Sequence, residues 1–109
     1  MGVNAFVPLG NTKTFTAAAT APTPVQVVGL ALGSGQYRII NSGTTIVFLG
    51  VGDTAALATT NSAVVTSSGL AIPLLPGTDE ILSFQLNAYF TGATVSGTAA
   101  VYITPGDGV

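Results

Sequence analysis

Apolar and polar side chains alternate along most of this chain with a period of two residues. Successive side chains of a β-strand point to opposite faces of a sheet, so the alternation is typical of strands that bury one face. The clearest stretches are residues 14–17, 36–39, 82–86 and 99–104. In the third stretch we expect Leu82, Phe84 and Leu86 to be buried and Gln85 to be exposed. The pattern predicts a fold made of β-strands.

Serine–glycine pairs separate several of these stretches and predict hairpins. Ser42-Gly43 lies between residues 36–41 and 45–51, and two strands joined by so short a segment commonly pair with each other. Ser96-Gly97 predicts a second hairpin between the stretches on either side of it. Pro76-Gly77 fits the two central positions of a type II turn, where proline fixes φ and glycine supplies a positive φ.

No stretch shows the 3.6-residue period of a long amphipathic helix. Residues 55–59 suffice for one helical turn at most, and Pro22 and Pro24 exclude a helix between the second and third strands. About eight to ten short strands with glycine and proline turns are typical of sandwiches, jelly rolls and barrels. We therefore predict an all-β fold, a single-domain antiparallel β-sandwich of the jelly-roll type over residues 1–109. Residues 1–9 are expected to form an extended N-terminal arm or an edge strand.

The chain carries very little charge. Only 6% of its residues are charged, against about 25% in an average soluble domain. Lys13 and Arg38 are the only cations and the net charge is −2, so we expect no nucleic-acid partner, which requires clustered basic residues. The longest apolar stretches, such as 27–32 and 46–51, are much shorter than the about 20 residues of a membrane-spanning helix. We predict a soluble chain without a targeting segment and without a membrane partner.

Low charge leaves two interpretations of the surface open. Charged residues discourage self-association and are depleted in interface cores, so a chain that functions inside an assembly can have this composition. Residues 46–49 are apolar on both faces, which suits a covered central strand or a subunit contact, and residues 1–9 could add as a strand to a neighbour's sheet. The alternative is an ordinary β-domain kept soluble by its many Ser and Thr hydroxyls.

One segment imitates a dinucleotide-binding fingerprint. Residues 50–55 have the pattern G-x-G-x-x-A after an apolar stretch. The fingerprint needs a full helix whose N-terminus holds the pyrophosphate, and an acid about 20 residues further on for the ribose. Here the helical stretch covers only residues 55–58, and no acid lies between Asp53 and Asp79. We interpret the motif as the end of a hairpin strand and expect no nucleotide or other cofactor.

The remaining reactive side chains form no catalytic or metal-binding pattern. Asp79 and Glu80 are adjacent, so on a strand they point to opposite faces and cannot converge on one substrate. The chain has no His and no Cys, so its Ser and Thr hydroxyls lack the usual activating base, with Lys13 as the one candidate. The acids are too scattered for a calcium loop. We predict no enzymatic activity, no catalytic residue and no metal site.

Several short stretches resemble, in the kinds of residue and in their order along the chain, the small decoration or cement proteins of tailed-bacteriophage capsids. They are YRIINSG (37–43), VFLG (47–50), PLLPGT (73–78), NAYF (87–90) and YITPG (102–106), within a similarity that spans residues 5–107. The resemblance implies a compact β-sandwich or jelly roll that assembles by symmetry on the capsid exterior, commonly as a trimer bridging capsomers. It carries over no functional residues, because such proteins act through surfaces.

The resemblance leads us to expect a structural virion protein that decorates and stabilises a tailed-phage capsid. Its partners would be the major capsid protein and further copies of itself, with a homotrimer favoured, on the capsid exterior after assembly in the host cytoplasm. The alternative is a carbohydrate-binding or adhesive β-sandwich module. Trp is absent, and Tyr37, Tyr89 and Tyr102 are expected to pack in the core or on a sheet face. A nucleotide-dependent enzyme is the third hypothesis, which the truncated motif disfavours.

Overall fold

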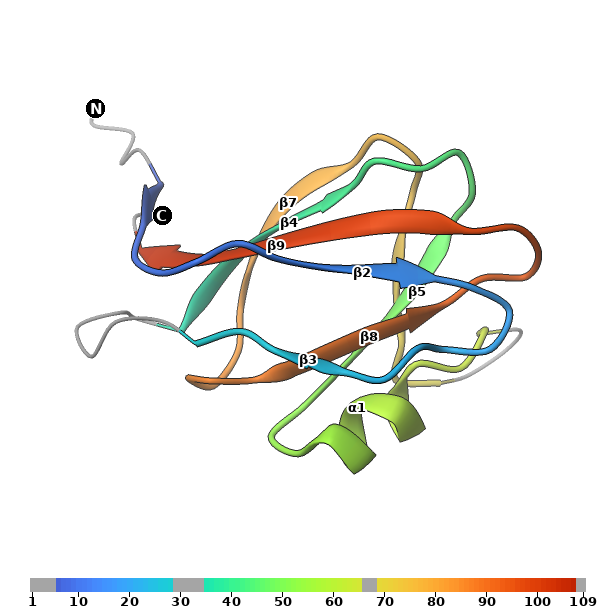
Figure 1. Ribbon diagram of the computed structural model, residues 1–109, viewed down its shortest axis with the longest axis horizontal. Helices are drawn as coiled ribbons and strands as arrows, with labels where there is room; N and C mark the ends of the chain where they lie inside the picture. The colour runs from blue at the N-terminus through green and yellow to red at the C-terminus, as the bar shows by residue number, and fades with distance from the viewer. Residues whose placement is uncertain (1–5, 29–34, 66–68, 108–109) are drawn as a thin grey trace.

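The protein is a sandwich of two antiparallel sheets, seen in a computed structural model that describes residues 6–28, 35–65 and 69–107 (Figure 1). The elements are β1 (Val7–Pro8), β2 (Lys13–Ala17), β3 (Val25–Gln26), β4 (Gln36–Asn41), β5 (Val47–Gly52), α1 (Ala55–Asn61), β6 (Ile72–Leu74), β7 (Asp79–Ser83), β8 (Tyr89–Ala93) and β9 (Ala99–Asp107). The first sheet, called sheet 1 here, has the order β1-β9-β4-β7, with β2 also paired to β9, and sheet 2 has the order β3-β8-β5-β6.

The strand pairing is that of a jelly roll. Strands pair in a nested series, β2 with β9, β3 with β8, β4 with β7 and β5 with β6, and every one of these pairs is antiparallel. The chain thus behaves like one long hairpin rolled into two sheets, which is the eight-stranded double-sheet arrangement. The predicted all-β fold, β-sandwich and jelly-roll type are confirmed.

Both predicted hairpins are wrong. Strands β4 and β5 lie in different sheets, and so do β8 and β9, so Ser42-Gly43 and Ser96-Gly97 lie in connections that cross from one sheet to the other. Turn residues favour a change of direction but do not say which strand the chain meets next. The first crossing is tight: a Cβ atom added to Gly43 would lie 2.3 Å from the Cβ of Ala99. Only glycine lets the chain pass so close to β9.

The core lies between the two sheets and follows the predicted alternation. In β4 the side chains of Tyr37, Ile39 and Asn41 are buried while Arg38 is exposed. The same pattern runs along β2 and β9. Buried hydrophobic residues from both sheets form one cluster: Phe15, Ala17, Val27, Tyr37, Ile39, Val47, Leu49, Leu74, Ala88, Phe90, Ala99, Val101 and Ile103.

The prediction for residues 82–86 holds only in part. Leu82 and Phe84 are partly buried and pack against the core, and Gln85 is exposed. Leu86 is 48% exposed, contrary to the prediction. Strand β7 ends at Ser83, so the alternation no longer reports a sheet face beyond that residue.

Two further sequence predictions concern the turn and the helix. The Pro76-Gly77 turn is confirmed, because the Thr78 N–H donates to the Leu75 carbonyl at 3.1 Å and Gly77 has a φ of 77°.

The helix is longer than the single turn that the sequence predicts. It spans seven residues, and the Thr54 hydroxyl caps it by accepting from the Leu57 N–H at 3.2 Å. An N-cap followed by alanines and leucine explains why it extends beyond one turn.

The described part of residues 1–9 pairs within its own chain. Val7 and Pro8 pair with Asp107 and Gly106 of the same chain, so the described part of the predicted arm is an edge strand of its own sheet. Residues 1–5 lie outside the described residues.

Strand β5 lies between β6 and β8, as expected for a central strand. Its side chains Val47 and Leu49 are buried, and its outer face contacts α1.

Candidate functional site

Helix α1 packs against the glycines of the fingerprint-like motif. A Cβ atom added to Gly50 would lie 2.3 Å from the Ala58 carbonyl oxygen, and one added to Gly52 would lie 2.6 Å from the Leu57 Cβ. Both glycines therefore allow α1 to pack directly on β5. The motif does end a strand, but not a hairpin strand, since β5 leads into α1. Its glycines serve helix–strand packing.

The adjacent acids diverge, as predicted. Asp79 lies on the outer face of sheet 1, where it accepts hydrogen bonds from Arg38 Nε at 2.9 Å and from Arg38 Nη2 at 2.5 Å. This bonding lowers the pKa of Asp79 and raises the pKa of Arg38. Glu80 aligns with buried Ile39 and so belongs to the other face. The two carboxylates cannot act together on one substrate.

Two threonine hydroxyls are used in hydrogen bonds to backbone carbonyls of neighbouring segments. The Thr91 hydroxyl donates to the Pro22 carbonyl at 2.8 Å, and the Thr94 hydroxyl donates to the Gly97 carbonyl at 2.7 Å. Lys13, the one candidate base, begins strand β2 opposite Ile103. The described residues contain no group of three or more acids that could hold a metal ion.

The three tyrosines have different environments. Tyr37 is buried, and its hydroxyl donates to the Gln85 carbonyl at 2.6 Å, which confirms the core prediction for this residue. Tyr89 is half-buried at the start of β8. Tyr102 is 42% exposed on the outer face of sheet 1, directly between Thr14 and Ile40 on the neighbouring strands. It is the most exposed of the three tyrosines.

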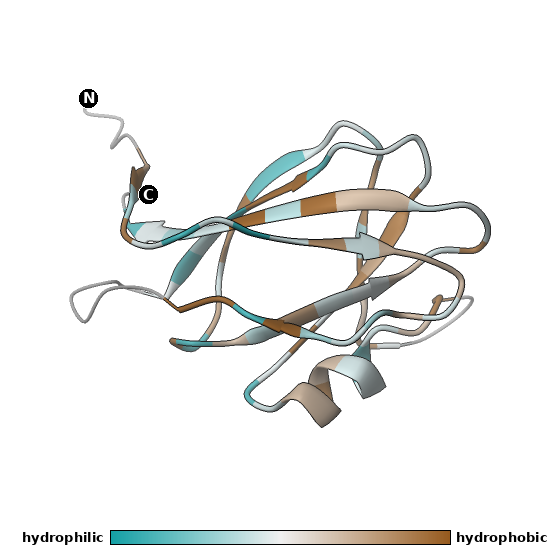
Figure 2. Cartoon of the chain, viewed as in Figure 1, coloured by the Kyte–Doolittle hydropathy of each residue, from teal (hydrophilic) through white to brown (hydrophobic). Residues whose placement is uncertain are grey.

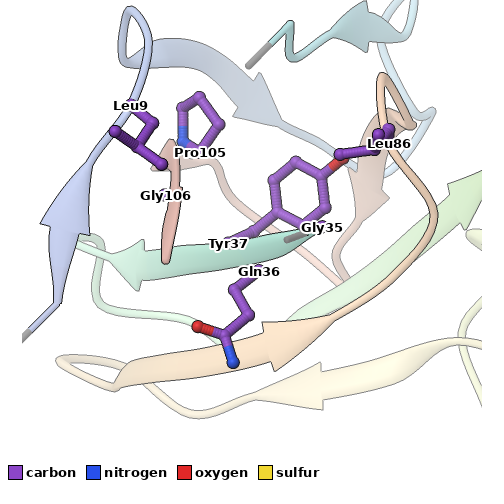
Figure 3. Close-up of a pocket in the computed structure, with 7 residues that line it drawn as sticks. All are labelled: Leu9, Gly35, Gln36, Tyr37, Leu86, Pro105 and Gly106. Atoms are coloured by element: carbon purple, nitrogen blue, oxygen red, sulfur yellow. The ribbon is translucent and has the colours of Figure 1, made fainter. Parts of the chain in front are cut away.

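A shallow pocket lies beside Tyr37 (Figure 3). Its enclosed volume is about 10 Å³, which is the room that about one water molecule needs. The lining residues are Leu9, Gly35, Gln36, Tyr37, Leu86, Pro105 and Gly106. None of them is charged, and Figure 3 shows the Gln36 side chain on the opposite side of β4 from the Tyr37 ring. The pocket is a small hollow in the surface with room for about one water molecule.

The sheet edges carry features that discourage further strand addition. Lys13 on β2 and Glu80 on β7 align with buried Ile103 and Ile39, so each edge strand places a charge on its core-facing side. The edge strand β6 carries Pro73, which has no N–H to donate. Inward charges and proline are recognised protections of exposed sheet edges.

The most unusual surface is an uncharged end of the sandwich, called the loop end here. It consists of the connections 42–46, 75–78 and 94–98, which lie away from β1 and the C-terminal end of β9 (Figure 1). None of the three contains a charged residue, and Figure 2 colours them mainly in the pale tones of intermediate hydropathy. Each presents one aliphatic side chain to solvent: Ile46 is 38% exposed, Leu75 57% and Val95 70%.

Buried hydrogen bonds hold two of these connections together. The fully buried Asn41 donates from Nδ2 to the carbonyls of Thr45 at 3.0 Å and Leu74 at 2.9 Å, and its Oδ1 accepts from the Gly43 N–H at 3.0 Å. Its backbone carbonyl also accepts from the Gly77 N–H at 2.9 Å. Sequence reasoning treated Asn41 as a strand end and missed this role. The sequence does carry a signal for the loop end: its three connections are uncharged, and each has one Ile, Leu or Val among Ser, Thr, Gly and Pro.

Comparison with known proteins gave no match to a family model, to a curated protein or to a solved structure. None of the helices in the described part of the chain is long and apolar enough to cross a membrane.

Proposed function

We propose that this protein is a structural virion protein that decorates and stabilises the outside of a tailed-phage capsid. It binds the major capsid protein and further copies of itself, most simply as a homotrimer, after assembly in the host cytoplasm. The observation that carries the proposal is the loop end, where three uncharged connections each present an aliphatic side chain to solvent. The resemblance of residues 5–107 to decoration proteins points the same way.

Physical chemistry connects this surface to a capsid. Uncharged surfaces with aliphatic side chains and hydroxyls are suited to apolar and hydrogen-bonded protein contacts. Many weak contacts arrayed on one lattice can hold firmly, because each engaged contact raises the effective concentration for the next. With so few charges at the contact, attachment depends little on salt.

The test mixes purified protein with capsids that lack it and measures co-sedimentation across a salt series, with the mass in solution determined by light scattering. We expect binding that changes little with salt, and the mass of an oligomer. A stable monomer that does not bind capsids would refute the proposal. Binding that disappears at modest salt would leave the location standing and refute the apolar mechanism.

A second candidate, carbohydrate binding, is favoured by one observation. Tyr102 is exposed on the outer face of sheet 1 beside Thr14, on the face that also carries the Arg38–Asp79 pair. An aromatic ring among hydroxyl and charged hydrogen-bonding groups can stack on a sugar. A glycan array is the test: a hit that Tyr102→Ala abolishes would support this function over the first.

A further inference from the structure

We infer that the outer face of sheet 1 is a contact surface between two copies of this chain, related by a two-fold axis. The residues that make the contact are Tyr102, Ile40 and Ile81, together with the Arg38–Asp79 ion pair. This inference goes beyond the proposed function, because it concerns a different part of the molecule from the loop end and does not depend on capsid binding.

The strand register shows that these residues form one patch. Tyr102 of β9 lies directly opposite Ile40 of β4, which lies opposite Asp79 of β7. Arg38 shares this face of β4 with Ile40 and lies opposite Ile81. Directly opposite residues of antiparallel strands have Cβ atoms about 4.5–5.5 Å apart. The five side chains therefore lie beside one another across three strands.

The patch is accessible, and its uncharged part is aromatic and aliphatic. Tyr102 is 42% exposed and Ile81 is 37% exposed, while Ile40 is half-buried. Helix α1 packs on sheet 2, where it contacts β5 and β8, and so it does not cover these residues. Tyrosine is enriched in protein interfaces, and burial of apolar surface drives most protein associations. The patch thus has the composition of a protein contact.

The charges on this face favour a second copy as the occupant. On strands β2, β7 and β9, the charged residues Lys13, Glu80 and Asp107 lie on the other side of the pleat, in register or in alternation with buried residues. The outer face of these strands and of β4 therefore carries one cation, Arg38, and one anion, Asp79. A partner surface of either sign would oppose one of them with a like charge.

A second copy of the same face avoids this conflict. A two-fold axis that runs parallel to the sheet, between Arg38 and Asp79, places each of these side chains opposite the other in the partner copy, because a two-fold contact uses the same patch on both chains. Exposed ion pairs contribute little free energy by themselves. The apolar side chains therefore supply the affinity, and the charges select the orientation.

The sheet edges make face packing the more favourable route of association. Lys13 on β2, Glu80 on β7 and Pro73 on β6 protect these strands against the addition of a strand from another copy. Packing of sheet on sheet needs no open edge, because side chains of the two faces interdigitate about 10 Å apart.

The experiment gives the face charges of one sign. Asp79→Lys leaves it with two cations, and Arg38→Glu leaves it with two anions. Each variant then opposes like charges to itself, whereas the two variants complement each other when they are mixed. Asp53→Lys, at an exposed position between β5 and α1, is the control for a changed net charge. Circular dichroism and thermal melting verify that each full-length variant folds, and sedimentation velocity over a concentration series measures association.

We expect the original protein to associate reversibly as its concentration rises, into a dimer, or into a hexamer where the homotrimer of the proposed function also forms. Each charge variant alone should associate about tenfold or more weakly. The equimolar mixture of Asp79→Lys and Arg38→Glu should recover to within about threefold of the original protein, and Asp53→Lys should stay within about twofold of it.

Four outcomes would overturn the inference. They are an original protein that stays monomeric at its highest soluble concentration, a trimer without further association, charge variants that associate like the original, and a mixture that does not recover what both variants have lost. A monomer that binds a glycan through Tyr102 would assign this face to the second candidate function. Loss of capsid binding with this association intact would refute the proposed function alone.

Discussion

At the scale of single residues, Asn41 is a buried polar side chain that holds two connections of the loop end together. It is fully buried, yet its side-chain amide donates two hydrogen bonds and accepts one. Burying a polar group costs free energy unless its hydrogen bonds are made, and removing one partner leaves others unsatisfied. Asn41 therefore stabilises the fold and shapes the loop end together.

We predict that Asn41→Ala lowers the free energy of unfolding by about 2–4 kcal/mol, because the carbonyls of Thr45 and Leu74 lose their buried donor. Urea denaturation measures this change. The neighbouring Ser42→Ala, which removes an exposed hydrogen bond to the Ala100 carbonyl, should cost less than about 1 kcal/mol. Equal effects of the two variants would show that burial is not the cause.

The Arg38–Asp79 pair gives a prediction about pH. Its hydrogen bond lowers the pKa of Asp79, so the stabilisation is present above the ordinary carboxyl pKa of about 3.9 and is lost as the pH falls toward the lowered value. Both side chains are nearly half exposed, so the effect is small and salt weakens it. Melting temperatures of the wild type and Asp79→Asn should differ near neutral pH and converge in strong acid. A difference that grows in acid would contradict this.

At the scale of elements, the helix on strand β5 explains the motif that resembled a nucleotide site. Gly50 and Gly52 leave no Cβ between the strand and α1. The sequence shows the two glycines but not what approaches them, because that depends on how the segment after Asp53 folds back. The length of α1, in contrast, could have been predicted from the Thr54 N-cap and the helix-favouring residues that follow it.

We predict that Gly50→Ala costs about 1–3 kcal/mol of unfolding free energy, since the new Cβ would collide with the helix backbone at Ala58. The control is Gly97→Asn, where nothing lies within 4 Å and asparagine tolerates the positive φ of 74°. Chemical denaturation of both variants checks this. A neutral Gly50→Ala would mean that α1 is not held on β5 as described.

The edge strands yield a prediction about solubility. Lys13→Val and Glu80→Val remove the inward charges of β2 and β7 and leave apolar edges open to pairing. We expect each variant to aggregate at concentrations where the original protein stays clear, as measured by light scattering over time. Exposed Thr14→Val on the outer face of β2 serves as the control for added hydrophobicity. Aggregation of the control alone would refute edge protection.

At the scale of the whole molecule, local patterns predicted the layers but not the path of the chain between them. Alternation identified the buried faces of β2, β4 and β9, because side-chain direction follows from strand geometry alone. The crossings after Asn41 and Ala93 could not be predicted, since identical turn residues serve a hairpin or a change of sheet. The three uncharged connections of the loop end can be recognised in the sequence, but their meeting at one end of the sandwich cannot.

The central claim is that this jelly roll decorates a capsid and contacts it through the loop end. Electron cryomicroscopy of undecorated capsids mixed with the protein is the most direct measurement. The account predicts added density at symmetry-related positions on the outer surface, with connections 42–46, 75–78 and 94–98 facing the shell. Capsids without added density, or density in which β1 and the C-terminal end of β9 face the shell and the loop end points to solvent, would contradict it.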